Sequence, residues 1–392
     1  MVTRISLLIF SVFLALLSPG IAMAASVPAA PTFSVQDTMD SLDLTELEEF
    51  RSQVEGELDP FLTGTSVREW LADFARGNWR FDFGQVTETI VKFLFKEILA
   101  NSSLLSKLII LSVLAALLIN LQTSFASGIS KFSYLACFLA MCALALGSFR
   151  VALGIGQQTI SNMTDFMMGI LPPMMALVAG LGNLNASAML FPLLMMVATV
   201  FGNAIKNVVF PLIIMSALLS LANHLSETVR VERLARFFTQ MAQISLGFLM
   251  TVFVGVLTLR SLYASVLDKV ALRTTRFVTD NAIPIVGKMV GDTVEVAAGY
   301  VVMIKDALGL FAALSILGII IFPVLKIAAL GLIYRLVGAV VEPMGDTRTA
   351  AILEIMSVHL FLLMAATAAV AVMFFIMIAI LAGMSNSFTM LR

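Results

Sequence analysis

The sequence predicts an all-α polytopic membrane protein, and three observations support this prediction. Of the 392 residues, 60% are hydrophobic and only 12% are charged, whereas soluble domains are roughly 45–50% apolar and about 25% charged. The mean hydropathy is +1.00, and long apolar runs recur along the chain. The net charge of −1 gives no indication of nucleic-acid binding. A soluble enzyme and a disordered protein are therefore excluded.

The first 24 residues have the three parts of a cleavable signal peptide. Arg4 supplies the positive charge, Ile5 to Leu17 form a short apolar stretch, and Ala22-Met23-Ala24 fits the small-x-small rule for signal peptidase. The apolar stretch is shorter than the roughly 18–20 residues that cross a bilayer. We expect cleavage after Ala24, which places residues 25–102 outside the cytoplasm.

The exported region, residues 25–102, is predicted to be acidic and helical. It carries 14 acidic residues against six basic ones. Asp43 is a candidate N-cap, with Glu46 as its capping-box partner, and Leu44, Leu47 and Val54 follow at helical spacing. This pattern indicates either a solvated helical cap on the first membrane span or a docking surface for partners.

The membrane domain, residues 103–392, is predicted to contain about 8–10 transmembrane or re-entrant helices. Two of its segments could either cross the bilayer or re-enter it, because proline or charge interrupts them: Phe166–Leu181 and Ala282–Met303. The other apolar runs are Leu104–Leu121, Phe132–Leu153, Ala188–Ala204, Val208–Ala222, Ile244–Tyr263, Ala307–Phe322, Val324–Val341 and Ile355–Leu381.

A possible two-fold internal repeat relates residues 166–263 to residues 278–375. A shift of 112 residues places Pro172 on Pro284 and Phe210-Pro211 on Phe322-Pro323. Repeats of this kind form many transporters, with the substrate path at the interface of interrupted helices. Whether the repeats are inverted or parallel stays open. The candidate helix breaks are Pro172, Pro173, Pro211, Pro284 and Pro323.

Basic residues give a conflicting indication of orientation. Arg230, Arg233 and Arg236 predict a basic amphipathic helix on the cytoplasmic surface. One apolar run further on, Lys269, Arg273 and Arg276 form a second basic segment. Both segments cannot be cytoplasmic if Ile244–Tyr263 crosses once.

Ionisable residues within the apolar region are the candidate functional residues. Lys288, Asp292 and Glu295 are spaced i, i+4, i+7 and share one helical face, and Lys305-Asp306 follows. Such residues usually face a bundle interior or water. They indicate either an internally neutralised structural network or the lining of an aqueous path.

The sequence gives no catalytic, cofactor-binding or metal-ligating set. Gly287-Lys288 lacks the spacing of a phosphate-binding loop, so any ATP dependence requires a separate subunit. Cys137 and Cys142 are too few for a disulfide framework, and His224 and His359 are isolated. We therefore expect neither an enzyme nor a cofactor.

Three segments resemble the stage III sporulation protein AE family of endospore-forming bacteria. They are ALRTTRFVTDNAIPIVGKMVGD at 271–292, NMTDF at 162–166 and EILAN at 97–101. The resemblance extends from about residue 40 to the C-terminus and is weakest in the N-terminal region.

This resemblance implies a multi-pass membrane component of the stage III sporulation complex. The complex is expected in the mother-cell-derived membrane around the forespore, as a channel or secretion-like apparatus required for late forespore development. The implied partners are membrane lipid and other stage III proteins, including a cytoplasmic ATPase and ring-forming membrane proteins. The family assigns no catalytic residues. Three roles stay open for the chain. It could be a core or platform of the channel, a pure scaffold of the complex without its own path, or an autonomous small-molecule permease.

Overall fold

The computed structural model describes most of the membrane domain and little of the region before it. The described residues are 44–45, 48, 66–67, 69–70, 83–124, 128–181, 184–225, 231–282 and 286–383. Within these ranges only the backbone is described at 83, 85–86, 121–124, 128–131, 184–186, 225, 260–282 and 286–298. The predicted signal peptide, Pro284 and Arg230 lie outside the described residues.

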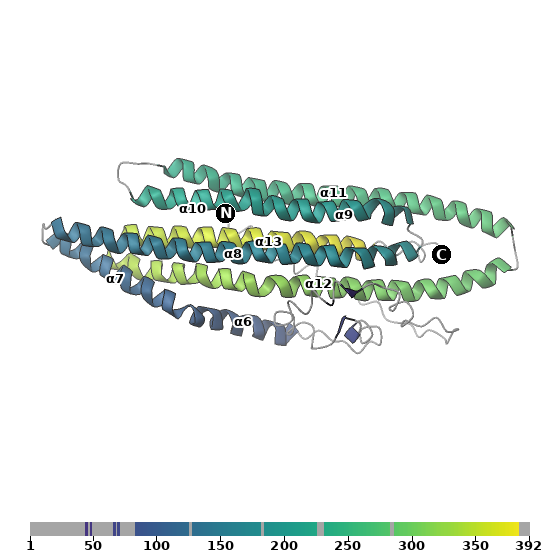
Figure 1. The fold of residues 1–392 in the computed structure, drawn as a ribbon, viewed down its shortest axis with the longest axis horizontal. Coiled ribbons are helices and arrows are strands. Elements are labelled where there is room, and N and C mark those ends of the chain that lie inside the picture. The colour runs from purple at the N-terminus through teal and green to yellow at the C-terminus, as the bar shows by residue number, and fades with distance from the viewer. Residues whose placement is uncertain are drawn as a thin grey trace.

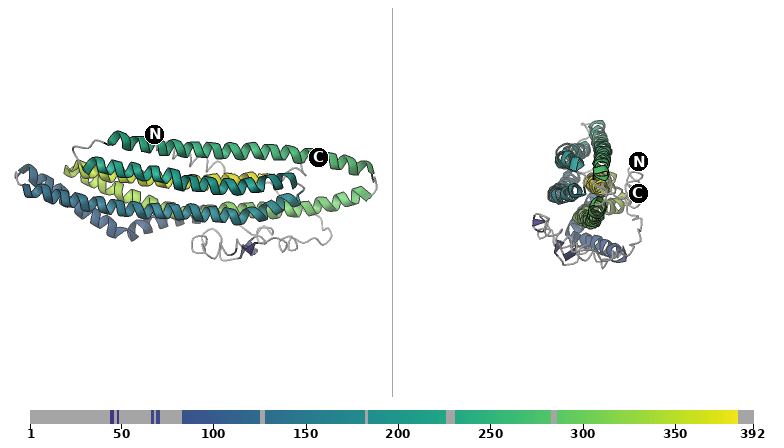
Figure 2. Two further views of the ribbon diagram at one scale, coloured as in Figure 1. Left: turned by 45° about the horizontal axis from the view of Figure 1, so that its top comes forward. Right: turned by 90° about the vertical axis from the view of Figure 1, so that its right-hand side faces the viewer.

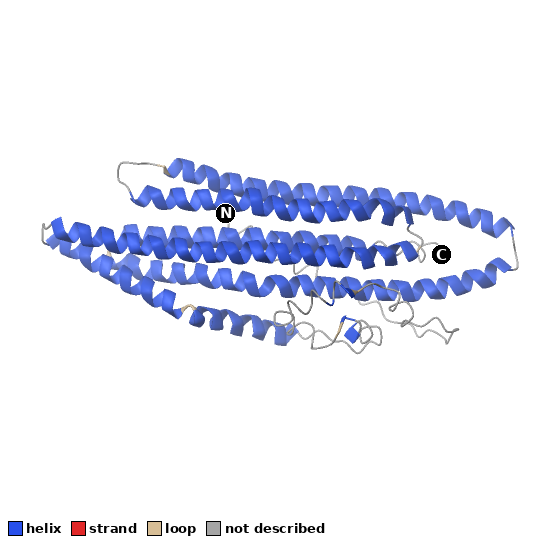
Figure 3. Ribbon diagram, viewed as in Figure 1, coloured by secondary structure: helices blue, strands red, loops and turns tan. Residues whose placement is uncertain are grey.

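The described residues form an all-helical bundle of long elements (Figures 1 and 3). They comprise α6 (Phe83–Ala100), α7 (Ser102–Ser124), α8 (Gly128–Gly180), α9 (Leu184–Ala204), the π-helix η1 (Ile205–Val209), α10 (Phe210–Leu225), α11 (Glu232–Ala282), α12 (Val286–Val341), the short 3-10 helix η2 (Glu342–Met344) and α13 (Thr347–Gly383). At 1.5 Å per residue, the 53 residues of α8 are about 80 Å long.

Two helices, α12 and α13, form the centre of the bundle. In their most apolar parts 67% and 61% of the residues are buried, against 17% in α11 and 22% in α7. Figure 2 shows the other helices arranged around them, with α8 and the α9–α10 rod side by side on one side of the bundle. α13 is apolar over most of its circumference and contacts α12, α8, α10 and α11, with Val358 on an exposed stripe.

The number of predicted membrane segments was too high. Six segments of the described residues are long and apolar enough to cross a membrane: Ser102–Asn120, Phe132–Gly180, Ser187–His224, Glu232–Leu259, Gly299–Met344 and Thr347–Gly383. Several predicted neighbours are parts of one helix. Phe166–Leu181 continues the helix that begins before Phe132, and most of Ala282–Met303 is the start of α12.

The predicted helix breaks at Pro172, Pro173 and Pro323 are wrong. The first two lie inside α8 and the third lies inside α12, and both helices continue beyond them. A proline removes one backbone donor, but apolar helices tolerate it where neighbouring helices hold the chain in place. Pro173 and Pro323 are buried among such neighbours.

Pro211 lies beside a local change of helical register. The N–H of Phe210 donates to the carbonyl of Ile205, five residues earlier, at the end of η1. A π-helical turn of this kind is a single wide turn within an otherwise α-helical rod. The rod from α9 to α10 therefore continues through Pro211, with an altered hydrogen-bond register just before it.

The region before the first span contacts the bundle at aromatic residues. Phe93 of α6 meets Phe322 edge-on at 4.6 Å, and Trp70 lies 5.5 Å from Phe311 between ring centroids. Ser66 and Glu69 form a reciprocal capping box, each backbone N–H donating to the other side chain at 3.1 Å.

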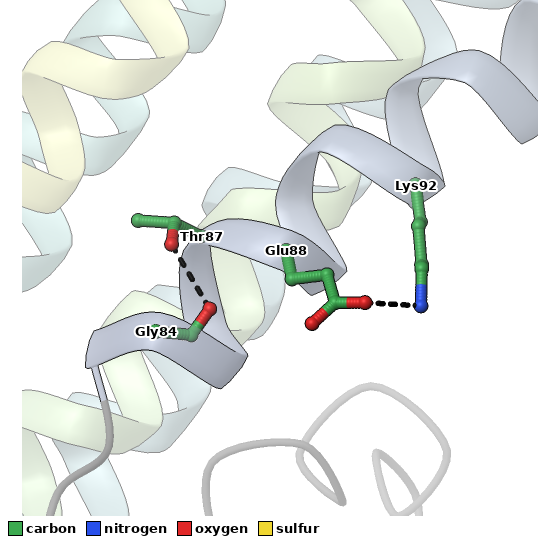
Figure 4. A network of polar contacts seen from close by, with 4 residues as sticks. All are labelled: Gly84, Thr87, Glu88 and Lys92. Carbon is green, nitrogen blue, oxygen red and sulfur yellow. Dashed lines mark hydrogen bonds and ion pairs between the residues drawn. The ribbon is translucent and has the colours of Figure 1, made fainter.

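The outer face of α6 carries an ion pair and also the exposed apolar residues Phe95 and Leu99. Glu88 and Lys92 form an exposed ion pair at 2.5 Å, one turn apart (Figure 4). The hydrogen bond and positive charge of Lys92 lower the pKa of the Glu88 carboxyl from its usual value of 4.5. α6 lies outside the candidate membrane spans.

The repeat stays a prediction. The shift of 112 residues places the connection between α10 and α11 on η2, yet it places the connection after α8 inside α12. The two proposed units therefore match at one end of the bundle and differ at the other.

Candidate functional site

The predicted polar face of Lys288, Asp292 and Glu295 lies at the start of α12. The backbone there is helical, so the i, i+4, i+7 spacing places the three residues on one face. Their side chains lie outside the described part of the structure. Whether they line a path or neutralise one another stays a prediction.

Lys305 is buried and holds the end of a neighbouring helix. Its ammonium donates to the carbonyl of Ala382, next to the last residue of α13, and lies 3.4 Å from Asp306 Oδ1. The Lys305 side chain is fully buried, whereas 54% of the Asp306 side chain is exposed. A cation is favourable at a helix C-terminus because unpaired carbonyls and the helix dipole concentrate negative charge there. Lys305 therefore anchors α13 to α12.

The two basic segments that gave conflicting orientations belong to one helix. α11 continues for 51 residues, about 77 Å. Arg233 and Arg236 lie near its start, where both are exposed and Arg236 pairs with Glu232 at 3.1 Å. Lys269, Arg273 and Arg276 lie near its other end. The two segments can therefore occupy opposite sides of a membrane.

A buried polar network that the sequence did not indicate joins α10, α11 and α13. His359 Nδ1 lies 2.7 Å from the carbonyl of Ile355, so Nδ1 carries the proton and Nε2 accepts in the neutral ring. Ser216 Oγ lies 2.9 Å from His359 Nε2, 3.0 Å from the Ala235 carbonyl and also against Thr239 Oγ1. The network fixes three helices at one level.

A second unpredicted cluster closes the end of the bundle where α13 begins. Arg348 donates through Nε at 2.6 Å, and also through Nη2, to the carbonyl of His224, the penultimate residue of α10. Its guanidinium also lies 4.9 Å from the centre of the Phe138 ring on α8. Asp346 caps α13 by accepting from the Thr349 N–H at 3.0 Å, and Tyr134 donates to the same carboxylate at 3.3 Å.

The third unpredicted site lies halfway along α8 and the α9–α10 rod. Lys206, within η1, donates to Ser161 Oγ of α8 at 2.9 Å, and Gln158 donates to Asn162 at 2.8 Å in the same part of α8. Gly202 permits this close approach, because a Cβ there would lie 2.7 Å from Thr164 Oγ1. We call Gln158, Ser161, Asn162, Asp165, Asn203 and Lys206 the polar waist.

Comparison with known proteins supports a single family. The family model described as Stage III sporulation protein AE matches residues 65–385. The chain is similar to Stage III sporulation protein AE of Bacillus subtilis (strain 168), with 30% identity over 356 residues, which cover 91% of this chain and 89% of that protein. No solved structure matches the chain.

Proposed function

Since the chain belongs to the stage III sporulation protein AE family, we propose that it is the integral membrane platform of a channel complex linking mother cell and forespore. Its partners in this proposal are other stage III sporulation proteins, including a cytoplasmic ATPase and ring-forming membrane proteins. It resides in the mother-cell-derived membrane around the forespore and is required for late forespore development. The proposal gives the chain no catalytic role.

The observation that best supports a platform is the fixation of α13 at both ends. Lys305 of α12 binds the carbonyl of Ala382 at the end of α13, and Arg348 at its start binds the last turn of α10. Between these anchors, α13 is buried against α12 along most of its length. A core held in this way suits a rigid support better than a permease whose helices must move.

The proposed orientation follows from the predicted export of residues 25–102. With six crossings, the connections at 125–127, 226–230 and 342–346 then face the cytoplasm. This places Arg233 and Arg236 on the cytoplasmic side, where basic residues are favoured. The connection at 283–285 faces outward, together with the C-terminus.

The platform proposal is tested by removing the Lys305 ammonium. Lys305→Met leaves the Ala382 carbonyl without its donor, which costs about 1–3 kcal/mol and weakens the anchor of α13. We expect protein abundance, recovery of partner proteins and sporulation to fall together. The matched control is Lys107→Met, which removes an exposed lysine of α7. Normal partner recovery with lost sporulation in Lys305→Met would contradict the proposal.

A path through the chain is the second candidate, and the charged start of α12 favours it. Asp292→Asn combined with Glu295→Gln keeps the shape and hydrogen-bonding capacity of both side chains while removing charge. If these residues line a path, the variant assembles normally but fails to support forespore development. Glu232→Gln, an exposed acid at the start of α11, serves as the control. Normal sporulation of the double variant leaves the platform without a path of its own.

A further inference from the structure

Two charged residues of the polar waist have no ion-pair partner within the described chain. The ion pairs of the described residues join Glu88 to Lys92, Glu232 to Arg236 and Lys305 to Asp306. Lys206 contacts only the neutral hydroxyl of Ser161, and Asp165 is exposed. A charge within an apolar helix costs on the order of 2.5–3.5 kcal/mol at a bilayer centre unless it finds a partner. At membrane depth, an external partner of opposite sign removes this cost for both charges.

The two charges lie on neighbouring helices about one turn apart. Asp165 follows Ser161 by four residues, which places both on the same face of α8. One turn rises about 5.4 Å, and Thr199 of α9 donates to Met168 of α8 one turn further on. Asp165 therefore lies beside Asn203, one turn of the rod away from Lys206. No ion pair joins these two described residues within one chain, where the Lys206 ammonium donates to Ser161 Oγ instead.

Beyond the polar waist, the exposed surface on both sides of these charges is largely apolar. α8 exposes small residues, among them Ala143, Gly147, Gly154 and Ala176, together with the larger Leu135, Leu139 and Val151. A Cβ at Gly147 or Gly154 would have no atom within 4 Å. The α9–α10 rod presents large residues on its exposed side, including Met189, Met196, Val200, Val208, Met215 and Leu218. The side-by-side position of α8 and the rod makes these two halves one continuous face (Figure 2).

We propose that this face is the interface with a second copy of the chain. Copies in one membrane share their orientation, so a two-fold axis between them runs along the helices. Such an axis places α8 against the α9–α10 rod of the other copy at the same level. Lys206 then meets Asp165 of the partner subunit, and Asp165 meets the partner's Lys206. The exposed apolar residues of α8 likewise lie against those of the partner's rod, and Gly147 and Gly154 allow close approach there.

Cysteine cross-linking in membranes tests whether this face contacts its own copy. Asn203 is exposed between the two charges and lies near the proposed axis. In a chain carrying Cys137→Ser and Cys142→Ala, Asn203→Cys treated with a short bis-maleimide should give a homodimer. The matched control is Thr251→Cys, an exposed residue of α11 away from this face. Equal or greater dimer yield from Thr251→Cys, or a product of another mass from Asn203→Cys, would overturn the proposal.

Charge exchange tests the pairing itself in the Asn203→Cys background. Lys206→Asp places like charges opposite each other, which costs several kcal/mol at an interface, so we expect at least about a tenfold loss of dimer. Asp165→Lys should cause a similar loss. The combination of Lys206→Asp with Asp165→Lys should restore the dimer.

Protein abundance separates a failed interface from a failed fold. If the single charge reversals accumulate poorly, the neutral variants Lys206→Gln and Asp165→Asn are compared instead, and each should still lower the yield of dimer. A combined exchange that accumulates normally without recovering the dimer would refute the pairing. Unchanged dimer in any well-expressed single variant would refute it as well.

Discussion

The close approach of α8 and α9 predicts a specific steric conflict at Gly202. A Cβ at this position would lie 2.7 Å from Thr164 Oγ1, 3.7 Å from Ile160 Cγ2 and 4.0 Å from Phe374 Cζ. Thr164 cannot easily yield, since its β-branched side chain is stiff and its hydroxyl donates to the Ile160 carbonyl at 2.8 Å. Gly202→Ala should therefore destabilise the protein by about 1–3 kcal/mol from overpacking, reduced by up to about 1 kcal/mol of improved helix propensity.

The assay is thermal unfolding of purified protein in one detergent. Gly255→Ala is the matched control, because a Cβ there has no atom within 4 Å, and it should match or slightly exceed the parent in Tm. Gly202→Ala should lower the Tm, and Thr164→Ala combined with it should recover most of the loss by removing the opposing hydroxyl. A Gly202→Ala protein as stable as the parent would refute the reasoning. A rescue variant no better than Gly202→Ala would show that Thr164 is not the obstacle.

Three further changes follow from the polar contacts. Ser216→Ala removes the hydroxyl that contacts His359 Nε2 and should lower the free energy of unfolding by about 1–3 kcal/mol. Ser106→Ala, which removes an exposed hydroxyl, should change the Tm little. Equal effects of the two changes would contradict the buried network. Arg348→Met removes two hydrogen bonds to the His224 carbonyl and the contact with the Phe138 ring, so it should lower the free energy of unfolding by about 1–3 kcal/mol. It should also lower the Tm more than Arg335→Met, which changes an exposed arginine. Lys92→Met should raise the pKa of Glu88 toward 4.5 in a carboxyl NMR titration, because Lys92 lowers this pKa. The contribution of this ion pair to the stability of α6 is present above pH 4.5 and is lost as the pH falls through the lowered pKa. An unchanged Glu88 titration in Lys92→Met would rule this pairing out.

Helix content could be predicted from the sequence, but helix continuity could not. Apolar periodicity marks Phe132–Leu153 and Phe166–Leu181 as helical, and both are. The polar residues between them suggest a loop because a solvated connection has the same composition. In the structure one of them, Ser161, accepts from Lys206 of the rod, and these residues belong to one 53-residue helix.

The polar contacts could be predicted only in part, because they too depend on residues far apart in the sequence. Lys305 could be selected because a lysine in an apolar run needs a partner, but the carbonyl of Ala382 lies 77 residues away. Lys206 gives a comparable signal, a lysine between the apolar runs 188–204 and 208–222, but its partner Ser161 lies 45 residues away. His359 and Ser216 are 143 residues apart, and no local pattern relates them.

The length of the bundle has a consequence for how the protein can exist outside its assembly. Phe132 of α8 is 77% exposed and Met189 of α9 is 46% exposed. Phe132 lies near the start of α8 and Met189 lies near its end, roughly 65 Å away along the bundle. A hydrocarbon layer is about 30 Å thick, so lipid can cover only one of these two levels. The apolar side chains at the other level are then exposed to water unless a protein surface covers them. Extraction of this protein together with its neighbours should therefore give soluble material under conditions in which the isolated chain precipitates.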